Sequence, residues 1–295
     1  MQTLIFGLVY GGIYAMMALA IGIVNSTSRI MNFSHAMVMM WGAMCAYYLY
    51  TMQGWPLILS LLTAIVVNML LNIVIYKICV QHLGDLSANT NWIISLFGMA
   101  HIIQNLARML FGTETYSFPY LFNGAKIYIF GTAVMWHEIA MFVIAIVIGV
   151  VYQTMSQKTR FGRSIRAVAY KPDTAKLMGI DSQKVMLICF GMAGAVSAIA
   201  GCLVAPIIYA SYSMTATVGL KGYAAALIGG VGNTKGALIG GFALGLIECL
   251  LGLFVSPAIR DVFSFAIMIL VIIFLPGGVM SAKVFTKGRT TTEKV

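Results

Sequence analysis

The sequence predicts an all-α protein that crosses a membrane many times. Of its 295 residues, 61% are hydrophobic and only 9% are charged, whereas a soluble domain carries about 25% charged residues. The apolar residues form runs of about 18 or more, the length that spans a bilayer as a helix. We expect one membrane domain covering residues 1–295. The formal net charge of +10 is assigned to loops and the tail, not to nucleic-acid binding.

Eight apolar runs are long enough to be full spans. They lie near residues 4–24, 34–52, 57–77, 92–111, 137–154, 185–209, 236–255 and 262–280. The first lacks the basic segment that begins a cleaved signal peptide, so we expect it to remain as a span. Residues 217–232 contain GYAAALIGGVG, which is apolar but too short for an ordinary span. We predict that this segment crosses as a short, broken helix, because irregular backbone at membrane depth is tolerated where protein surrounds it.

Residues 157–184 determine the expected orientation. This segment holds 7 of the 18 Lys and Arg residues of the chain and only two acidic residues. The positive-inside rule places such a loop in the cytoplasm. Counting crossings from it puts the amino terminus and the long loop 112–136 outside. With the broken helix included, the basic carboxyl tail is expected in the cytoplasm.

The first half of segment 157–184 is predicted to be an amphipathic helix. Arg160, Arg163 and Arg166 recur every three residues with apolar residues between them, as on a helix that lies along a membrane. A loop that only orients the protein, or a patch that binds lipid headgroups, would have the same basic composition. Both interpretations stay open alongside a docking role.

The second half of the segment is predicted to be a short capped helix. Pro172 and Asp173 suit its first turn, where proline is tolerated and an acid faces the positive end of the helix. Gly179 suits the left-handed position after its last turn. Leu177 and Met178 would give it an apolar tip. A short capped helix between two basic flanks is typical of an element that docks on a partner protein.

Three polar residues within or beside apolar runs are candidates for a solute pathway. Asn32 and His35 stand where the second run begins, and Glu248 lies well inside the seventh. An ionisable side chain at membrane depth is costly and therefore points to function. The alternative is that Glu248 makes a structural hydrogen bond to a neighbouring helix, and that Asn32 and His35 lie at the membrane interface.

Glycines crowd the segment that ends in Glu248. Two four-residue spacings recur there, Gly232–Gly236–Gly240 and Gly241–Gly245, which is the pattern of closely packed membrane helices. The alternative is that the broken helix lines a pathway and moves with it. The glycines expected to border the route in that case are Gly229, Gly230 and Gly232.

No cofactor site is predicted in this chain. GVGNTKG differs from a phosphate-binding loop, because Thr234 precedes Lys235 and Gly236 follows it, where that loop needs Gly and then Ser or Thr. The five cysteines are scattered through apolar segments without metal-ligand spacing. We therefore expect no bound metal and no ATP hydrolysis by this chain.

Three stretches carry a resemblance to a known family. They are RIMNFSHAMVMMWGA (29–43), RSIRAVAYKPDTAKLMGI (163–180) and KGYAAALIGGVGNTKGALIGGFALGLIE (221–248). Their order and spacing resemble the permease subunits of bacterial ABC importers of the branched-chain amino acid (Liv) type, nearly end to end. The family motif carries Asn, Phe and His at the positions of Asn32, Phe33 and His35. This chain departs from it at Ala36 and Met37, where relatives usually have Gly and often an acid.

The resemblance implies a transport subunit, not an enzyme, in the bacterial plasma (inner) membrane. It implies that the chain moves branched-chain or other apolar amino acids by alternating access, while two partner ATPase subunits bind ATP and magnesium. A second, related permease subunit and an extracytoplasmic substrate-binding protein are the other expected partners. The segment 157–184 is then the ATPase-coupling loop, and the residues expected to act there are Arg163, Arg166, Pro172, Asp173, Leu177, Met178 and Gly179.

Two other functional classes remain as alternatives. An ion-coupled secondary transporter or channel usually carries several ionisable residues near the membrane midplane, often in repeated halves. This chain shows one carboxylate well inside a span and no evident repeat. The last alternative is a membrane enzyme or a purely structural scaffold. An enzyme would need a set of nucleophile, base and acid or metal-ligand spacing, and neither is evident in the sequence.

Overall fold

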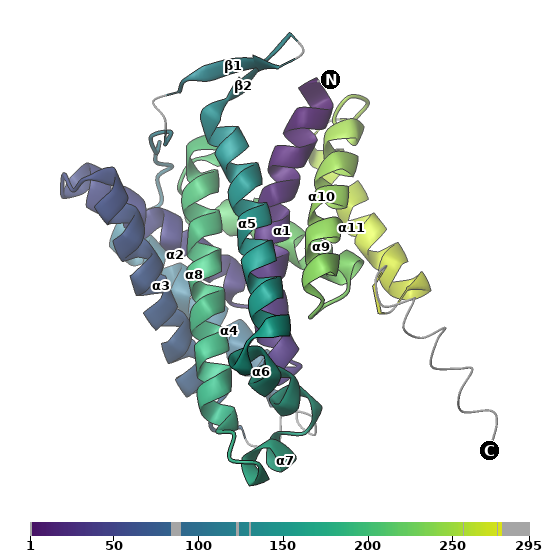
Figure 1. The fold of residues 1–295 in the computed structure, drawn as a ribbon. Coiled ribbons are helices and arrows are strands. Elements are labelled where there is room, and N and C mark those ends of the chain that lie inside the picture. The colour runs from purple at the N-terminus through teal and green to yellow at the C-terminus, as the bar shows by residue number, and fades with distance from the viewer. Residues whose placement is uncertain are drawn as a thin grey trace.

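The computed structural model describes residues 2–83, 90–121, 124–129, 131–255, 257–275 and 277–278. Most of them are helical, which confirms the predicted all-α class (Figure 1). The elements are α1 (Gln2–Ser28), α2 (His35–Tyr47), a π-helical turn (Tyr48–Met52), α3 (Leu57–Cys79), α4 (Asn91–Phe111), β1 (Lys126–Ile129), β2 (Thr132–Met135), α5 (Trp136–Lys158), α6 (Arg160–Tyr170), α7 (Pro172–Leu177), α8 (Ser182–Ile208), a second π-helical turn (Thr215–Gly219), α9 (Leu220–Gly229), α10 (Thr234–Leu251) and α11 (Pro257–Phe274).

Among the described residues, six helices are long and apolar enough to cross a membrane. They are Thr3–Ser28, Leu57–Cys79, Asn91–Phe111, Trp136–Lys158, Ser182–Ile208 and Thr234–Leu251. The predicted run 34–52 is divided between the 13-residue α2 and the π-helical turn after it. The apolar part of α11 is limited to Val262–Val271, and residues 279–280 of the last predicted run lie outside the described residues. The predicted count of eight full spans is therefore not confirmed.

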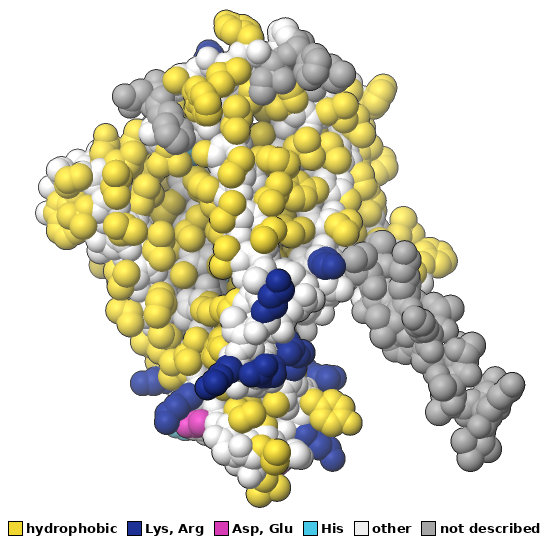
Figure 2. All heavy atoms as spheres, in the orientation of Figure 1, with side chains coloured by type: hydrophobic (Ala, Val, Ile, Leu, Met, Phe, Trp, Pro, Cys, Tyr) yellow, Lys and Arg dark blue, Asp and Glu magenta, His cyan; other side chains and the backbone are white. Residues whose placement is uncertain are grey.

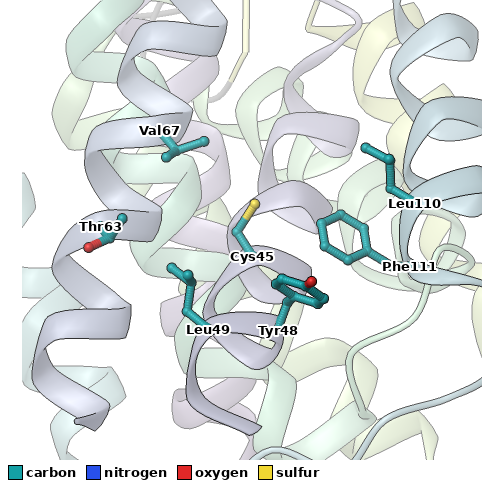
Figure 3. A pocket seen from close by; sticks show the side chains of 7 residues that line it. All are labelled: Cys45, Tyr48, Leu49, Thr63, Val67, Leu110 and Phe111. Carbon is teal, nitrogen blue, oxygen red and sulfur yellow. The ribbon is translucent and has the colours of Figure 1, made fainter. Parts of the chain in front are cut away.

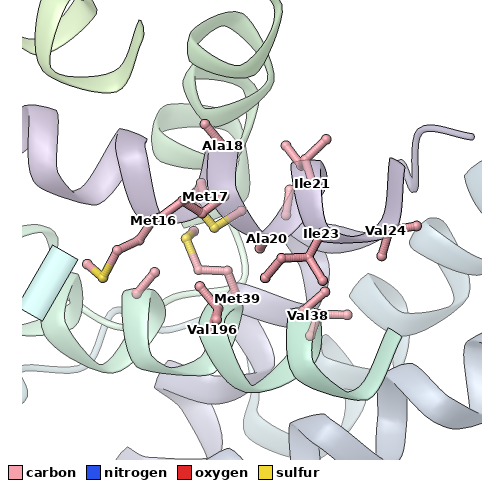
Figure 4. Packing of buried hydrophobic residues seen from close by; sticks show 14 of the residues in the cluster. Met16, Met17, Ala18, Ala20, Ile21, Ile23, Val24, Val38, Met39 and Val196 are labelled. Carbon is pink, nitrogen blue, oxygen red and sulfur yellow. The ribbon is translucent and has the colours of Figure 1, made fainter. Parts of the chain in front are cut away.

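Two helices form the centre of the bundle. In the apolar spans of α1 and α8, 72% of the residues are buried, whereas only 22–28% are buried in those of α3, α4 and α5. Figure 4 shows the core that results, in which Met16 and Met17 of α1 pack near Met39 of α2 and Val196 of α8. Because a bilayer is itself apolar, the exposed helices can face lipid or another subunit without a penalty for their hydrophobic surfaces.

Glycines let α10 approach two other helices closely. On one face of α10, Gly241 and Gly245 lie so near α1 that an added Cβ would overlap the backbone of Ala15 or Gly11. On the other face, Gly236 and Gly240 pack against α9 in the same way. The predicted small-residue spacing thus brings helices into close contact. Its two glycine pairs contact different helices, α1 on one face of α10 and α9 on the other.

The segment predicted as a broken helix contains α9, which is short and almost wholly buried. A π-helical turn leads into α9 without interruption, and the helix stops at Gly230. Both Gly230, with φ of 99°, and Gly232, with φ of 86°, hold backbone conformations that favour glycine. These two residues make the sharp turn from α9 into α10.

A two-stranded hairpin was not predicted. Strands β1 and β2 pair antiparallel, with Lys126 opposite Met135 and Ile129 opposite Thr132. Figure 1 places the hairpin at the end of the bundle that also holds the amino terminus, and α7 at the opposite end. The prediction had this part of 112–136 only as a loop, and its alternating KIYI and TAVM residues lie in strands.

A methyl group at position 245 should disturb the bundle. The substitution Gly245→Ala must push α10 away from Gly11, so we expect it to lower the free energy of unfolding by about 1–3 kcal/mol and to reduce the melting temperature in detergent. The matched control is Gly98→Ala in α4, where nothing lies within 4 Å of the added Cβ and alanine favours the helix by up to about 1 kcal/mol. Equal melting temperatures for the two variants would contradict the close α1–α10 contact.

Candidate functional site

The basic segment between α5 and α8 folds as two short helices. Helix α6 begins at Thr159, whose Oγ1 accepts a hydrogen bond of 3.1 Å from the backbone N–H of Gly162. Its apolar side, with Gly162, Ile165 and Val168, is buried against α1, α5 and α8. The predicted amphipathic helix is therefore present, and its three-residue spacing separates a buried side from a basic one.

Backbone contacts hold α6 against neighbouring helices. The guanidinium of Arg166 donates to the carbonyl oxygen of Ser156 near the end of α5. The Nε of Arg29, which follows α1, donates to the carbonyl oxygen of Ala169 at 2.9 Å. Arg163 is exposed, and its guanidinium makes no hydrogen bond to the residues that the structure describes. A displacement of α6 would thus be transmitted to α1 and α5.

Helix α7 has the predicted caps. Pro172 occupies its first turn together with Asp173, whose carboxylate lies 3.8 Å from the Nζ of Lys176. Gly179 has φ of 80°, the left-handed conformation expected just beyond the helix. The hydroxyl of Ser182 donates to the carbonyl of Pro172 at 3.0 Å and closes the loop onto α8.

The start of α8 is capped as well. Asp181 accepts a hydrogen bond of 3.1 Å from the backbone N–H of Lys184. This bond stabilises the carboxylate and holds the pKa of Asp181 below its usual range. The connection from α7 to α8 is therefore ordered by local hydrogen bonds.

The tip of α7 exposes two large apolar side chains. Leu177 is 87% exposed and Met178 is 79% exposed, whereas Ala175 on the other side of the helix is buried. In Figure 1, α7 lies at the far end of the bundle from the hairpin. An apolar pair in this position, which we call the α7 tip, is suited to enter a groove on another protein.

A buried polar cluster surrounds Asn32. Its Oδ1 accepts hydrogen bonds from the backbone N–H of Ser34 at 3.0 Å and from the Ser34 hydroxyl at 2.6 Å. Its Nδ2 donates to Asn72 of α3 at 3.3 Å, and Asn72 in turn donates to the carbonyl of Phe190 in α8 at 2.7 Å. The hydroxyl of Tyr223 in α9 donates to the Asn32 carbonyl at 2.7 Å. Asn32 therefore joins the α1–α2 connection to α3, α8 and α9.

His35 has a different environment from Asn32. It is fully buried, and neither ring nitrogen has a hydrogen-bond partner among the described residues. Buried polar atoms are nearly always paired, so an imidazole in this state can accept or donate a bond to a solute or to water. Beside it in the chain, the Phe33 ring stacks on Trp92 at 6.4 Å and on Tyr223 at 5.8 Å between ring centroids.

Glu248 lies in a second buried cluster. Its carboxylate accepts a hydrogen bond of 2.7 Å from the hydroxyl of Tyr14 and pairs with the ammonium of Lys221. The Nε of Arg260 lies 3.5 Å from the same carboxylate without the geometry of a hydrogen bond. The cluster thus joins α10 to α1, α9 and α11. This arrangement supports the structural interpretation of Glu248, because its oxygens already have protein partners.

The predicted pathway residues therefore belong to two clusters connected by α9. Tyr223 reaches Asn32, and Lys221, two residues earlier on the same helix, reaches Glu248. The sequence reasoning overlooked Tyr223, Lys221 and Asn72. Lysine and asparagine inside apolar runs were the available signal for the last two, since polar side chains at membrane depth need partners.

The glycines proposed to border a route have no open space beside them, because atoms of neighbouring residues occupy it. An added Cβ at Gly229 would overlap the carbonyl of Gly236, and one at Gly230 would lie 2.8 Å from the carbonyl oxygen of Gly277. At Gly232 the nearest atom is the Oδ1 of Asn25, 3.0 Å away. These three positions serve close packing in this conformation.

An apolar pocket lies away from both clusters. It has a volume of about 360 Å³ and is lined by Cys45, Tyr48, Leu49, Thr63, Val67, Leu110 and Phe111. Figure 3 shows that these side chains come from the end of α2, the π-helical turn after it, α3 and α4. None of the predicted site residues lines it, so it is not the predicted route.

A family model described as the branched-chain amino acid transport system / permease component matches residues 3–272. The chain belongs to this permease family. Its members are transport subunits of ABC importers, so the predicted resemblance and the assignment as a transport subunit rather than an enzyme are confirmed.

Named relatives of this permease match over its full length. The high-affinity branched-chain amino acid transport system permease protein LivH of Salmonella typhimurium is 29% identical, covering 100% of this chain and 97% of the relative. LivH of Escherichia coli K12 is 27% identical with the same coverage. The permease protein BraD of Pseudomonas aeruginosa is 26% identical, with 100% and 98% covered. No solved structure matches the chain.

Removing the charge of Glu248 should destabilise the permease. The substitution Glu248→Gln leaves the ammonium of Lys221 and the guanidinium of Arg260 without this carboxylate, and a broken buried pair costs about 3–5 kcal/mol. We expect a lower melting temperature in detergent. The matched control is Glu114→Gln, since Glu114 is exposed and should tolerate the change. A Glu248→Gln variant as stable as the control would exclude a structural role for the cluster.

Proposed function

We propose that this permease imports branched-chain or other apolar amino acids by alternating access. Its relatives are named for branched-chain amino acid transport, and they match the chain from end to end. The proposed assembly contains two ATPase subunits, a second related permease subunit and an extracytoplasmic substrate-binding protein. The amino terminus and the hairpin face the outside, and α6, α7 and the carboxyl terminus face the cytoplasm of a bacterial cell.

The α7 tip carries the proposal for ATPase coupling. Leu177 and Met178 are the apolar anchors for a groove on an ATPase subunit, because both are directed away from the bundle. Pro172, Asp173 and Gly179 hold the ends of the helix that presents them. Arg163 and Arg166 belong to the supporting helix α6, which is bonded to α5 and packed against α1 and α8. A push on α7 is therefore passed to helices on both sides of the coupling loop.

The proposed route for the amino acid passes beside His35. Its unpartnered imidazole is a suitable contact for the amino or carboxyl group of the solute, and the stacked rings around Phe33 are suitable for an apolar side chain. Asn32 borders this route but is bonded to four neighbouring groups. A change at His35 should therefore alter recognition more specifically than a change at Asn32.

Glu248 and the glycines have a supporting role in this proposal. The Lys221–Glu248 pair fixes the start of α9, while Gly229, Gly230 and Gly232 fix its end. Between them lies Tyr223, which bonds to the Asn32 cluster. We propose that α9 moves as a unit during alternating access and carries one wall of the route with it.

An acidic residue at the α7 tip should separate the permease from its ATPase. The substitution Leu177→Asp places a charge where an apolar pocket is expected, and burying an unpaired charge is strongly unfavourable. We expect loss of ATPase copurification and loss of leucine uptake in proteoliposomes. The control is Tyr128→Asp in the hairpin, where a side chain of similar exposure, 76%, becomes acidic at the other end of the molecule.

ATPase copurification tests the docking element, and competition for leucine uptake tests the substrate class separately. Copurification at the control's level with Leu177→Asp would show that the α7 tip is not the docking element. In the unsubstituted importer, excess valine or isoleucine should compete with leucine uptake, whereas lysine and glutamate should not. Competition by the charged amino acids alone would contradict the apolar substrate class and leave the coupling result intact.

A further inference from the structure

The basic residues of the coupling loop fall into two electrostatically different groups. Next to the α7 tip, Lys176 lies 3.8 Å from Asp173, and at the start of α8, Lys184 lies 3.3 Å from Asp181. Both are thus balanced by an acid three residues away. The remaining basic residues of the loop have no acidic partner within 4.0 Å in the part of the chain that the structure describes. We call these five the α6 band: Lys158, Arg160, Arg163, Arg166 and Lys171.

The α6 band is held in a fixed orientation. All five side chains are exposed, while the opposite side of α6 is buried through Gly162, Ile165 and Val168. Because that side is packed against α1, α5 and α8, the helix cannot rotate to bury or scatter its cations. The fixed orientation concentrates five positive charges along one edge of the molecule, although Arg166 also makes one bond to the Ser156 carbonyl.

An apolar surface leads directly to the band. Helix α5 exposes Val143, Val147, Val150 and Val151, each between 48% and 60%. The helix then ends at Lys158, the first member of the band. Figure 2 shows the same succession, with dark-blue side chains in a row across the lower part of the molecule below a broad yellow surface. An apolar surface that ends at a row of fixed cations is typical of a membrane protein. The apolar part contacts the lipid tails, and the cations contact the lipid headgroups.

We infer that the α6 band binds the phosphate groups of anionic phospholipids at the membrane surface. Arginine presents a planar set of donors that fits two phosphate oxygens, and lysine adds a point charge. Each cation at a membrane surface strengthens attraction to anionic lipid about fivefold. The band would thereby hold the supporting helix at the bilayer, while the α7 tip projects beyond it. This inference needs neither the proposed substrate nor the proposed ATPase contact.

The test uses two cations of the band that have no part in the proposed coupling site. Lys158→Gln with Arg160→Gln is compared with Lys126→Gln with Lys184→Gln, which removes the same charge from other exposed positions. The full-length permease, purified in detergent with its copurifying subunits, is titrated with phosphatidylglycerol or phosphatidylcholine and examined by native mass spectrometry. We expect the band variant to bind its tightest phosphatidylglycerol about 25-fold more weakly, because it lacks two cations that contribute about fivefold each, and the control variant to match the unsubstituted permease.

The loss of affinity in the band variant must depend on the negative charge of the lipid headgroup. Phosphatidylcholine binding should be the same in all three proteins, and added salt should weaken phosphatidylglycerol binding in the unsubstituted permease. Unchanged phosphatidylglycerol affinity in the band variant would overturn the inference. The same holds for equal weakening of both lipids. If the band variant keeps its phosphatidylglycerol affinity and loses its ATPase, the band binds the ATPase and the inference is wrong.

Discussion

The close contact between α1 and α10 is the constraint on which the rest of the structure depends. Glycine at positions 241 and 245 lets the two backbones meet where any side chain would separate them. With α10 held against α1, its other glycine face is available to α9, which packs there through Gly229 and Ala225. In a bilayer, where apolar surfaces gain little by avoiding lipid, such backbone contacts provide much of the association between helices.

Both buried polar clusters follow from the position of α9. Lys221 can reach Glu248, and Tyr223 can reach the carbonyl of Asn32, because α9 packs against both α1 and α10. The first cluster satisfies a charge that would be costly at membrane depth. In the second, His35 has no hydrogen-bond partner among the described residues. The carboxylate of Glu248 is thus already occupied by protein groups and the imidazole of His35 is not, which is why we propose recognition at His35 and support at Glu248.

The proposed coupling loop, residues 157–184, connects this core to the end of the bundle that holds α7. Helix α6 is packed on α1, α5 and α8, and α7 is joined to α8 by the bond from Ser182 to Pro172. Near the same end, α1 is tied to α5 by a 2.9 Å bond between the hydroxyls of Ser26 and Tyr152, and to α8 by a 3.0 Å bond from Thr27 to Cys189. A force on the α7 tip would therefore reach α1 and α8, the two most buried of the long helices.

Local sequence signals predicted the helices and the coupling loop better than they predicted contacts. The run 57–77 corresponds to α3, and Pro172 and Gly179 occupy the cap positions expected of them, because apolar length and capping act over a few residues. The partners of Glu248 lie 27 and 234 positions away in the chain, at Lys221 and Tyr14. The spacing of apolar residues along the chain carries no information about contacts between residues so far apart in the sequence. It also missed the hairpin, whose short strands fall below the length used to find spans.

Photo-crosslinking from position 177 tests the coupling role of the α7 tip most directly. Benzoylphenylalanine in place of Leu177, in the assembled importer within native membranes, should form a covalent adduct with an ATPase subunit. The same group in place of Tyr128 should not. An adduct with the ATPase from position 128 but none from position 177, or adducts from position 177 with lipid alone, would contradict the proposal that α7 is where the ATPase acts on this permease.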